Sequence, residues 1–188
     1  MASVRKASAY SKRKPVINTR RSRKTQFSFV KMVPQQKIVK FNMGDVKAFE
    51  SGKFNIKISI LSEENVQIRD LALESSRQSL HKDLTNLLQK NFFLRCEKYP
   101  HNILRNNRVY SGGSKGERIQ TGMSKSFGTP EGRAAIVKAG EPIFTAFFSG
   151  DSNIPKIRNF FKKIKAKLPC KTKIITEKLK ENTLTVAS

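Results

Sequence analysis

The side chains best suited to acid–base or nucleophilic catalysis are few and scattered in this sequence. They are His81, His101, Cys96, Cys170 and the adjacent pair Glu63–Glu64. Catalysis by proton transfer needs an acid and a base held together with tuned pKa values, and neither histidine belongs to a Ser/His/Asp or Cys/His pattern. The glutamate pair follows Ser62, where helix capping explains acids placed against the positive end of a helix dipole. The sequence therefore predicts no catalytic residues and a protein that is not an enzyme.

The two cysteines argue against a disulfide framework and against a metal centre. Cys96 and Cys170 lie far apart, with no CxxC motif and no nearby pair of histidines. Disulfide-rich and zinc-binding proteins place these ligands at short, recognisable spacings. We expect both thiols in the core, a reducing cytoplasm, no metal and no cofactor.

A glycine-rich loop is the remaining candidate for ligand chemistry, and its residues are Tyr110, Ser111, Gly112, Gly113, Ser114, Lys115 and Gly116. The GxxxxGK[ST] motif of nucleotide hydrolases is absent. We interpret residues 105–125 as an RNA-contacting loop, because glycine lets a backbone approach phosphates closely and Tyr110 can stack on a base. Its cations are Arg105, Arg108, Lys115, Arg118 and Lys125. The alternative is a surface loop whose charges only keep the protein soluble.

The charge of the chain favours a nucleic-acid partner. Lys and Arg number 38 against 14 Asp and Glu, which gives +24 on 21.3 kDa, and the first 31 residues contain no carboxylate. So basic a segment, with few apolar residues, cannot fold alone and favours a phosphate-rich partner. The cations expected to contact RNA there are Arg5, Lys6, Lys12, Arg13, Lys14, Arg20, Arg21, Arg23 and Lys24. The alternative is a disordered tail that only solubilises the protein.

The elements that must position these residues follow from hydrophobic periodicity. Strands are predicted at 37–41, 53–60, 92–99, 133–138, 142–148 and 171–176. A long helix is predicted to begin at Ser62 and to carry an apolar stripe over 66–90, with His81 as a candidate break. A short helical stretch is expected at 119–126 and a basic amphipathic helix at 153–167, whose Lys162 and Lys163 would face phosphates. A membrane-surface helix is the alternative for that last segment.

Together these elements predict an α+β fold: a single-domain sandwich of a mixed, mostly antiparallel sheet with two main helices. We expect a basic N-terminal arm at 1–31, a folded domain at 32–176 with a flexible loop at 105–117, and a tail at 177–188. No apolar run approaches the roughly 20 residues that span a bilayer. The expectation is a soluble, intracellular protein.

One segment resembles a family signature. The stretch from Glu117 to Gly132 is similar to the DRxQxGMxxAFGKPxG motif of a large-subunit ribosomal protein family, called L-sixteen in bacteria and L-ten-e in archaea and eukaryotes. The segments 33–44, 66–74 and 101–107 resemble the archaeal and eukaryotic branch in the same order. Asn102, Glu117 and Thr129 depart from the family's usual residues, and the glycine-rich loop is slightly longer and more basic.

The resemblance implies a structural protein that binds large-subunit rRNA near the central protuberance and helps position tRNA near the peptidyl-transferase centre. It implies that the loop 108–116 lies toward tRNA, that Arg118 and Gln120 contact RNA, that Met123 and Phe127 pack, and that the signature glycines shape the backbone. Arg69, within one of the similar segments, joins the expected RNA contacts.

The expected partners are large-subunit rRNA, tRNA and neighbouring ribosomal proteins, with no membrane and no homo-oligomer, in the cytoplasmic ribosome. Two other functions stay open at this point. One is an RNA-processing or RNA-modifying enzyme that holds its substrate on the basic surface, and the other is a module that binds anionic membranes or other polyanions.

Overall fold

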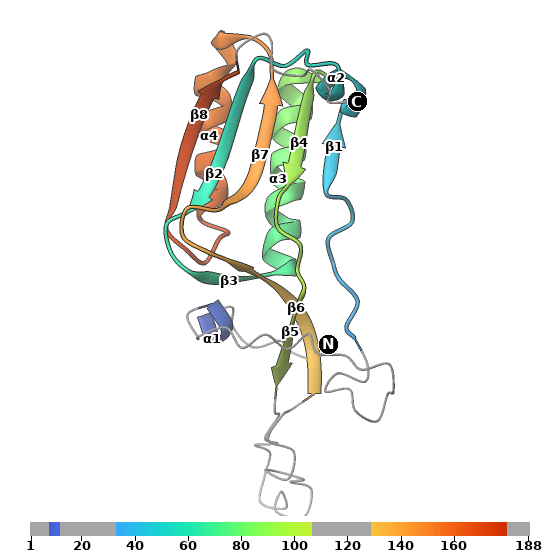
Figure 1. The fold of residues 1–188 in the computed structure, drawn as a ribbon, viewed down its shortest axis with the longest axis vertical. Coiled ribbons are helices and arrows are strands. Elements are labelled where there is room, and N and C mark those ends of the chain that lie inside the picture. Colours follow the sequence, from blue (N-terminus) through green and yellow to red (C-terminus); the bar gives the residue numbers. More distant parts are fainter. Residues whose placement is uncertain (1–7, 12–32, 107–128, 180–188) are drawn as a thin grey trace, which may run out of the picture.

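The computed structural model describes residues 8–11, 33–106 and 129–179 of the 188-residue chain. Figure 1 shows two sheets arranged one beyond the other along the long axis of the molecule. The strands of the larger sheet, in spatial order, are β1 (Asn42–Gly44), β4 (Phe92–Cys96), β7 (Pro142–Phe148), β2 (Ile56–Ser62) and β8 (Thr172–Lys178), and every neighbouring pair is antiparallel.

Strand β2 shows which face of this sheet meets the main core. Ile56, Ile58 and Ile60 are at most 1% exposed, whereas Lys57 and Leu61, which point to the other face, are only half-buried. Successive side chains of a strand alternate between faces. The alternation of the sequence therefore correctly predicts both the strand and its inner face.

The smaller sheet contains β3 (Val66–Arg69), β6 (Thr129–Val137) and β5 (Asn102–Asn106), in that spatial order and again antiparallel. Its strands continue those of the larger sheet: β2 leads into β3, β4 into β5 and β6 into β7. Main-chain hydrogen bonds fix this corner, from Gly140 N to Ser62 O (2.7 Å) and from Ser62 N to Glu141 O (3.1 Å). The small sheet is thus a bent extension of the large one.

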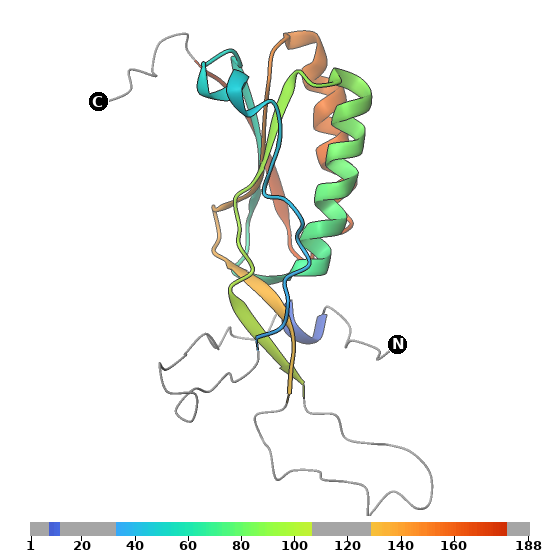
Figure 2. The ribbon, with the colours of Figure 1, turned by 90° about the vertical axis from the view of Figure 1, so that its right-hand side faces the viewer.

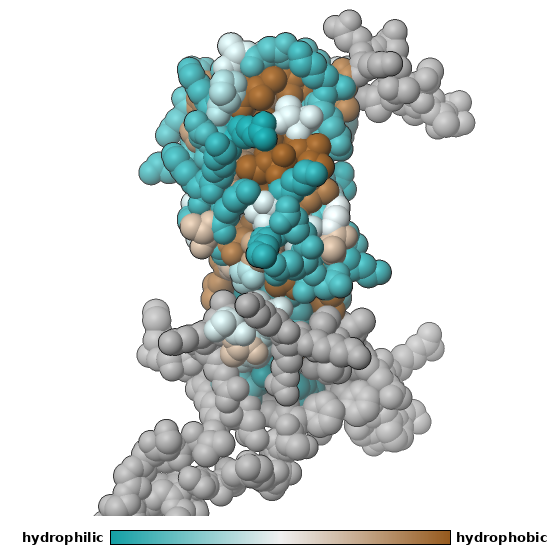
Figure 3. Space-filling view, turned by 90° about the vertical axis from the view of Figure 1, so that its left-hand side faces the viewer, coloured by the Kyte–Doolittle hydropathy of each residue, from teal (hydrophilic) through white to brown (hydrophobic). Residues whose placement is uncertain are grey.

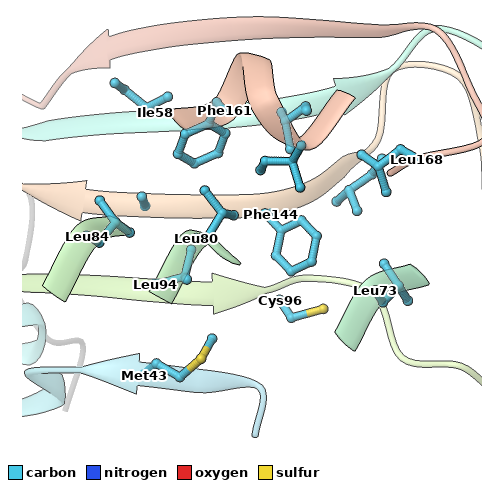
Figure 4. Packing of buried hydrophobic residues seen from close by; sticks show 14 of the residues in the cluster. Met43, Ile58, Leu73, Leu80, Leu84, Leu94, Cys96, Phe144, Phe161 and Leu168 are labelled. Carbon is cyan, nitrogen blue, oxygen red and sulfur yellow. The ribbon is translucent and has the colours of Figure 1, made fainter. Parts of the chain in front are cut away.

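Two long helices cover one face of the larger sheet (Figure 2). They are α3 (Asp70–Leu88) and α4 (Ile154–Lys165), and a 3₁₀ helix, η3 (Asp151–Asn153), leads into α4. Leu73, Leu80 and Leu84 of α3 and Phe161 of α4 are at most 1% exposed and pack against the inner face of the sheet, as Figure 4 shows. Burying each such side chain contributes about 1.5–3 kcal/mol. This layer of helix on sheet confirms the predicted α+β sandwich.

A short helix, α2 (Val46–Glu50), covers part of the opposite face at the far end of the large sheet. Asp45 caps it by accepting a hydrogen bond from Ala48 N at 3.0 Å, and Phe49 stacks on Phe93 with 4.4 Å between ring centroids. Gly44 precedes this cap with φ of +93°, and a Cβ there would overlap the carbonyl oxygen of Phe92. Glycine is required at this position.

The start of the long helix was predicted wrongly. Residues 66–69 form strand β3, and α3 begins only at Asp70 and runs without a break past His81. Ser62 ends β2, and its hydroxyl donates to the carbonyl oxygen of Glu64 at 2.7 Å in a turn. The Ser62–Glu64 signal for a helix start marks instead the corner between the two sheets.

Other element boundaries also differ. Residues 37–41 are not a strand: Lys37 N and Val39 N donate to side chains of α3, and only Phe41 bonds to the main chain of β4, through Cys96 N. Arg105 and Asn106, which were predicted to belong to a flexible loop at 105–117, lie in β5, and the rest of that predicted loop is outside the described residues. Glu177 and Lys178 of the predicted tail belong to the end of β8. The short helical stretch at 119–126 lies outside the described residues.

Candidate nucleic-acid interface

An extended connecting segment, residues 33–41, fixes where the basic N-terminal sequence joins the folded part. Asp70 accepts a hydrogen bond from Lys37 N and Glu74 accepts one from Val39 N, each at 3.3 Å. Phe41 O accepts from Cys96 N at 2.8 Å, and Pro34 O accepts from Arg133 Nε at 2.6 Å. The connecting segment is therefore attached to α3, β4 and β6, and it enters the structure beside the small sheet.

The same end of the molecule carries the other long basic segment. Asn106, the last residue of β5, pairs with Thr129, the first residue of β6. Figure 1 shows that this end of the small sheet and the start of the connecting segment lie at the same end of the long axis; we call it the small-sheet end. Residues 1–32 contain ten Lys and Arg and no acid, and residues 107–128 contain four against one Glu. More than half of the net charge of +24 thus belongs to two segments that join the fold at one end.

Many carboxylates of the described residues are paired within the fold. Glu74 forms a pair with Arg77 at 2.6 Å, with both side chains 11% exposed, and the hydrogen bond from Arg77 lowers the pKa of Glu74. Glu141 accepts from Lys98 at 2.6 Å, which lowers the pKa of Glu141. Two further pairs join surface residues, Lys57 to Glu177 at 2.8 Å and Lys178 to Asp151 at 2.7 Å. These acids are neutralised by neighbouring cations and therefore do little to offset the charge of the other Lys and Arg side chains.

Asp70 differs because burial is the largest influence on its carboxyl group, although the nearby charges of Arg69 and Lys37 partly offset it. It is 4% exposed, and burial raises its pKa above the ordinary value. The main-chain N–H groups of Leu71 (2.8 Å) and Lys37 (3.3 Å) oppose that shift by hydrogen bonding. Asp70 thus serves to hold the connecting segment against α3.

Helix α4 and the strand that follows it form a second basic surface. No Asp or Glu occurs between Asp151 and Glu177, whereas eight exposed cations do: Lys156, Arg158, Lys162, Lys163, Lys165, Lys167, Lys171 and Lys173. Those in the last turn of α4 also complement the negative end of its dipole. Figure 3, which faces the side where β8 and α4 lie, shows hydrophilic residues framing a smaller apolar area.

The described members of the predicted RNA-contact set lie in two regions. Arg69 ends β3, and its guanidinium lies 5.6 Å from the ring centroid of Tyr10 in α1 (Ser8–Ser11). Arg105 lies in β5 of the same small sheet. Lys162 and Lys163 are exposed on α4, where Lys163 also approaches Asp83 at 3.6 Å. The structure thus brings Arg69 and Arg105 onto one sheet and places the two lysines on the other basic surface.

The other predicted site residues lie outside the described residues. These are Arg5, Lys6, Lys12, Arg13, Lys14, Arg20, Arg21, Arg23, Lys24, Arg108, Lys115, Arg118, Gln120, Lys125 and the loop from Tyr110 to Gly116. Of the matched signature positions, Pro130 and Gly132 are described, and both lie in β6. A Cβ on Gly132 would meet nothing within 4 Å, so contacts within the described chain do not explain that glycine.

Catalytic chemistry finds little support among the described side chains. Burial lowers the pKa of His81, whose ring packs edge-on against Phe92. Burial raises the pKa of Cys96 to about 11 and also raises the pKa of Cys170, which disfavours thiolates at neutral pH. Within residues 8–11, 33–106 and 129–179, no group of three His, Cys, Asp or Glu could hold a metal ion. No helix in those same ranges is long and apolar enough to cross a membrane.

Sequence reasoning missed Tyr99 and Arg133 as surface residues of interest. Arg133 Nη1 donates to the hydroxyl of Tyr99 at 3.1 Å, although the two residues are 34 positions apart. The available signal was an aromatic residue between Lys98 and a proline, in a segment that ends a predicted strand. The pairing itself depends on β5 and β6 lying side by side, which periodicity did not predict.

Comparison with known proteins accounts for most of the chain. The family model described as ribosomal protein L16p/L10e matches residues 16–175. This chain belongs to that family. It is 36% identical over 154 residues to large ribosomal subunit protein uL16 of Pyrobaculum aerophilum, covering 81% of this chain and 84% of the relative. The uL16 protein of Methanospirillum hungatei is 31% identical over 159 residues, covering 84% of this chain and 90% of the relative.

Membership of the L16p/L10e family confirms the resemblance carried by the signature. A protein of this family is a structural constituent of the large ribosomal subunit and not an enzyme. This finding removes the RNA-processing enzyme as an alternative.

Proposed function

We propose that this chain is held in the large subunit by its small-sheet end, which binds large-subunit rRNA near the central protuberance and helps position tRNA near the peptidyl-transferase centre. The observation that carries the proposal is that both strongly basic segments, 1–32 and 107–128, join the fold at one end. Lys and Arg side chains that neutralise phosphates release counterions, so many cations at one end favour a polyanion there.

The folded part supports this role by rigidity. The connecting segment is hydrogen-bonded to α3, β4 and β6, and the small sheet continues directly into the strands of the large one. The core therefore fixes the positions at which the two basic segments join the fold. Such pre-organisation reduces the entropy lost when the segments bind RNA.

The exposed cations of α4 offer a second, separate contact. They lie on the helix layer, whereas Arg69 and Arg105 lie on the small sheet. Two basic surfaces on different elements suit a protein packed between rRNA helices, since phosphate contacts position a protein without reading sequence.

The test is binding of the full-length protein to a large-subunit rRNA transcript over a range of salt concentrations. Each phosphate contact is expected to contribute about 0.9 to the log–log slope, the value for duplex DNA. Replacing Arg20 and Arg21 by Gln should therefore lower the magnitude of the slope by about the contribution of two phosphate contacts. The matched control replaces Lys57 and Lys178, which already pair with Glu177 and Asp151, and should leave the slope nearly unchanged. A wild-type protein that does not bind rRNA at physiological salt would contradict the proposal.

The role toward tRNA needs its own experiment. Shortening residues 111–116 is expected to leave incorporation into subunits largely intact and to impair tRNA accommodation, because the proposal gives this segment a role toward tRNA. Incorporation is measured by co-sedimentation and accommodation by tRNA binding to the purified subunits. Unchanged tRNA accommodation would remove this part of the proposal.

A further inference from the structure

The fold leaves the aromatic ring of Tyr99 exposed at the surface. The large apolar side chains that are exposed in the described residues are Val39, Val46, Leu71, Tyr99 and Leu179, and Tyr99 is the aromatic one, with 49% exposure. It lies in the connection from β4 to β5, between Lys98 and the buried Pro100. Single exposed apolar side chains are common on protein surfaces, but a ligand that stacks on this ring would remove apolar surface from water.

The ring of Tyr99 is held in place from behind. Its centroid lies 5.5 Å from that of Phe41, with 31° between the ring planes, and Phe41 packs against the core. The Tyr99 hydroxyl accepts from Arg133 Nη1 at 3.1 Å, and the guanidinium of Arg133 is itself fixed by donating to Pro34 O at 2.6 Å. The ring therefore loses little conformational entropy when a ligand stacks on it.

The guanidinium of Arg133 lies beside this ring, next to the connecting segment. Arg133 stays partly exposed beside the hydroxyl, whereas the charge of Lys98 is paired with Glu141 at 2.6 Å. The imidazole of His101 is exposed, with its Nδ1 3.1 Å from Tyr99 O. Pro34 adjoins the residue at which the N-terminal sequence enters the described structure. A rigid aromatic face with an adjacent guanidinium is the arrangement that binds an unstacked base and its phosphate.

We propose that Tyr99, supported by Phe41 and Arg133, is a stacking site for one unpaired nucleobase of RNA. The inference rests on the proposed RNA-binding function and adds to it a specific ligand class. It concerns unpaired nucleotides, because a base inside a duplex has both faces covered by its neighbours. Arg133 acts as a positioning residue that orients the ring and neutralises the adjoining phosphate.

The test uses the absence of tryptophan from this sequence. The variant Tyr99→Trp places a single indole fluorophore at the site in the full-length protein. A single-stranded oligoadenylate of about ten nucleotides is expected to quench its emission at saturation, and an RNA duplex of the same length is not. The control Val46→Trp places the fluorophore on α2, at the far end of the large sheet, where neither RNA should quench it.

Affinity measurements with the unlabelled protein complete the test. Tyr99→Leu is expected to weaken binding of the oligoadenylate by about five- to a hundredfold while leaving the salt slope unchanged, because a stacked base is lost and no phosphate contact is. Tyr99→Phe keeps the ring and should bind within about threefold of wild type. Thermal unfolding of both variants shows whether each is folded.

The outcomes are distinguishable from failure of the proposed function. If wild-type protein binds the oligoadenylate but the introduced tryptophan is not quenched, or is quenched equally by the duplex, the stacking site is overturned while RNA binding stands. Equal affinity of folded Tyr99→Leu and wild type would overturn it as well. If wild-type protein binds neither RNA, the proposed function itself fails.

Discussion

The carboxylate of Glu74 accepts a hydrogen bond from the main-chain N–H of Val39 at 3.3 Å, across 35 residues of sequence. The same carboxylate accepts from Arg77 at 2.6 and 2.7 Å and from Gln78 at 2.9 Å. One side chain on the first turns of α3 thus joins the helix to the connecting segment. This contact is part of what sets where the basic N-terminal sequence leaves the fold.

Replacing Glu74 by Gln is expected to lower the free energy of unfolding by about 3 kcal/mol at neutral pH, because Arg77 is left buried without its anion. The pKa of Glu74 is lowered in the fold, so its stabilisation is complete above the ordinary value of 4.5 and is lost as pH falls through the folded pKa. Urea unfolding of both proteins between pH 3 and 7 measures this. The exposed Glu63→Gln is the control, and a loss no larger for Glu74→Gln than for Glu63→Gln would contradict the structure.

Asp70 should show the opposite dependence on pH. Burial raises its pKa above the ordinary value of 3.8, so the fold binds this proton more tightly than the unfolded chain does. The stabilisation from the protonated form is present below that value and is lost as pH rises through the folded pKa. The free energy of unfolding of Asp70→Asn minus that of wild type is therefore expected to grow over the pH range just above 3.8. Urea unfolding at each pH is the measurement, and parallel curves would count against it.

Two glycines form a matched pair for backbone strain. Gly44 has φ of +93° and no room for a Cβ beside Phe92 O, whereas Gly132 lacks such a φ and has nothing within 4 Å. Gly44→Ala is expected to cost about 3 kcal/mol or more of unfolding free energy, from backbone strain and overlap together. Gly132→Ala should change it by less than about 0.5 kcal/mol. Chemical denaturation of the two variants decides, and equal effects would contradict the geometry.

Cys96 should resist alkylation in the folded protein. It is 4% exposed and its pKa is about 11 rather than 9.0, which reduces the thiolate fraction about a hundredfold before burial blocks access. Iodoacetamide labelling at pH 8, followed by peptide mass spectrometry, is expected to modify native Cys96 at least about a hundredfold more slowly than the urea-unfolded chain. Similar rates in both states would show that the thiol is open to solvent.

The sequence predicts best those elements whose pattern is local. The alternation around Ile56, Ile58 and Ile60 identifies β2 and its inner face, and the stripe that includes Ile157, Phe161 and Ile164 identifies α4. Each element buries one face, and the spacing of its own apolar residues indicates which face that is. The inner layer of the sandwich follows from these patterns.

The small sheet could not be predicted in the same way. No Gly or Pro separates Val66–Arg69 from the helix that follows, so the sequence gives no sign of a boundary there. The strand conformation of this segment comes from its pairing with Ala134–Val137, far along the chain. Asn102–Asn106 likewise depends on β6. Tertiary pairing overrides local preference in such short segments. The Tyr99–Arg133 contact was missed for this reason, since it exists only once these strands are assembled.

The bent passage from one sheet to the other has a mechanical consequence. Three separate chain connections cross the corner, at 63–65, 97–101 and 138–141, and hydrogen bonds between Ser62, Gly140 and Glu141 tie two of them together. A force that a bulky partner applies to the small sheet is then distributed over three covalent connections, and the small sheet cannot rotate about a single hinge. The small sheet should therefore move together with the large sheet as one rigid body.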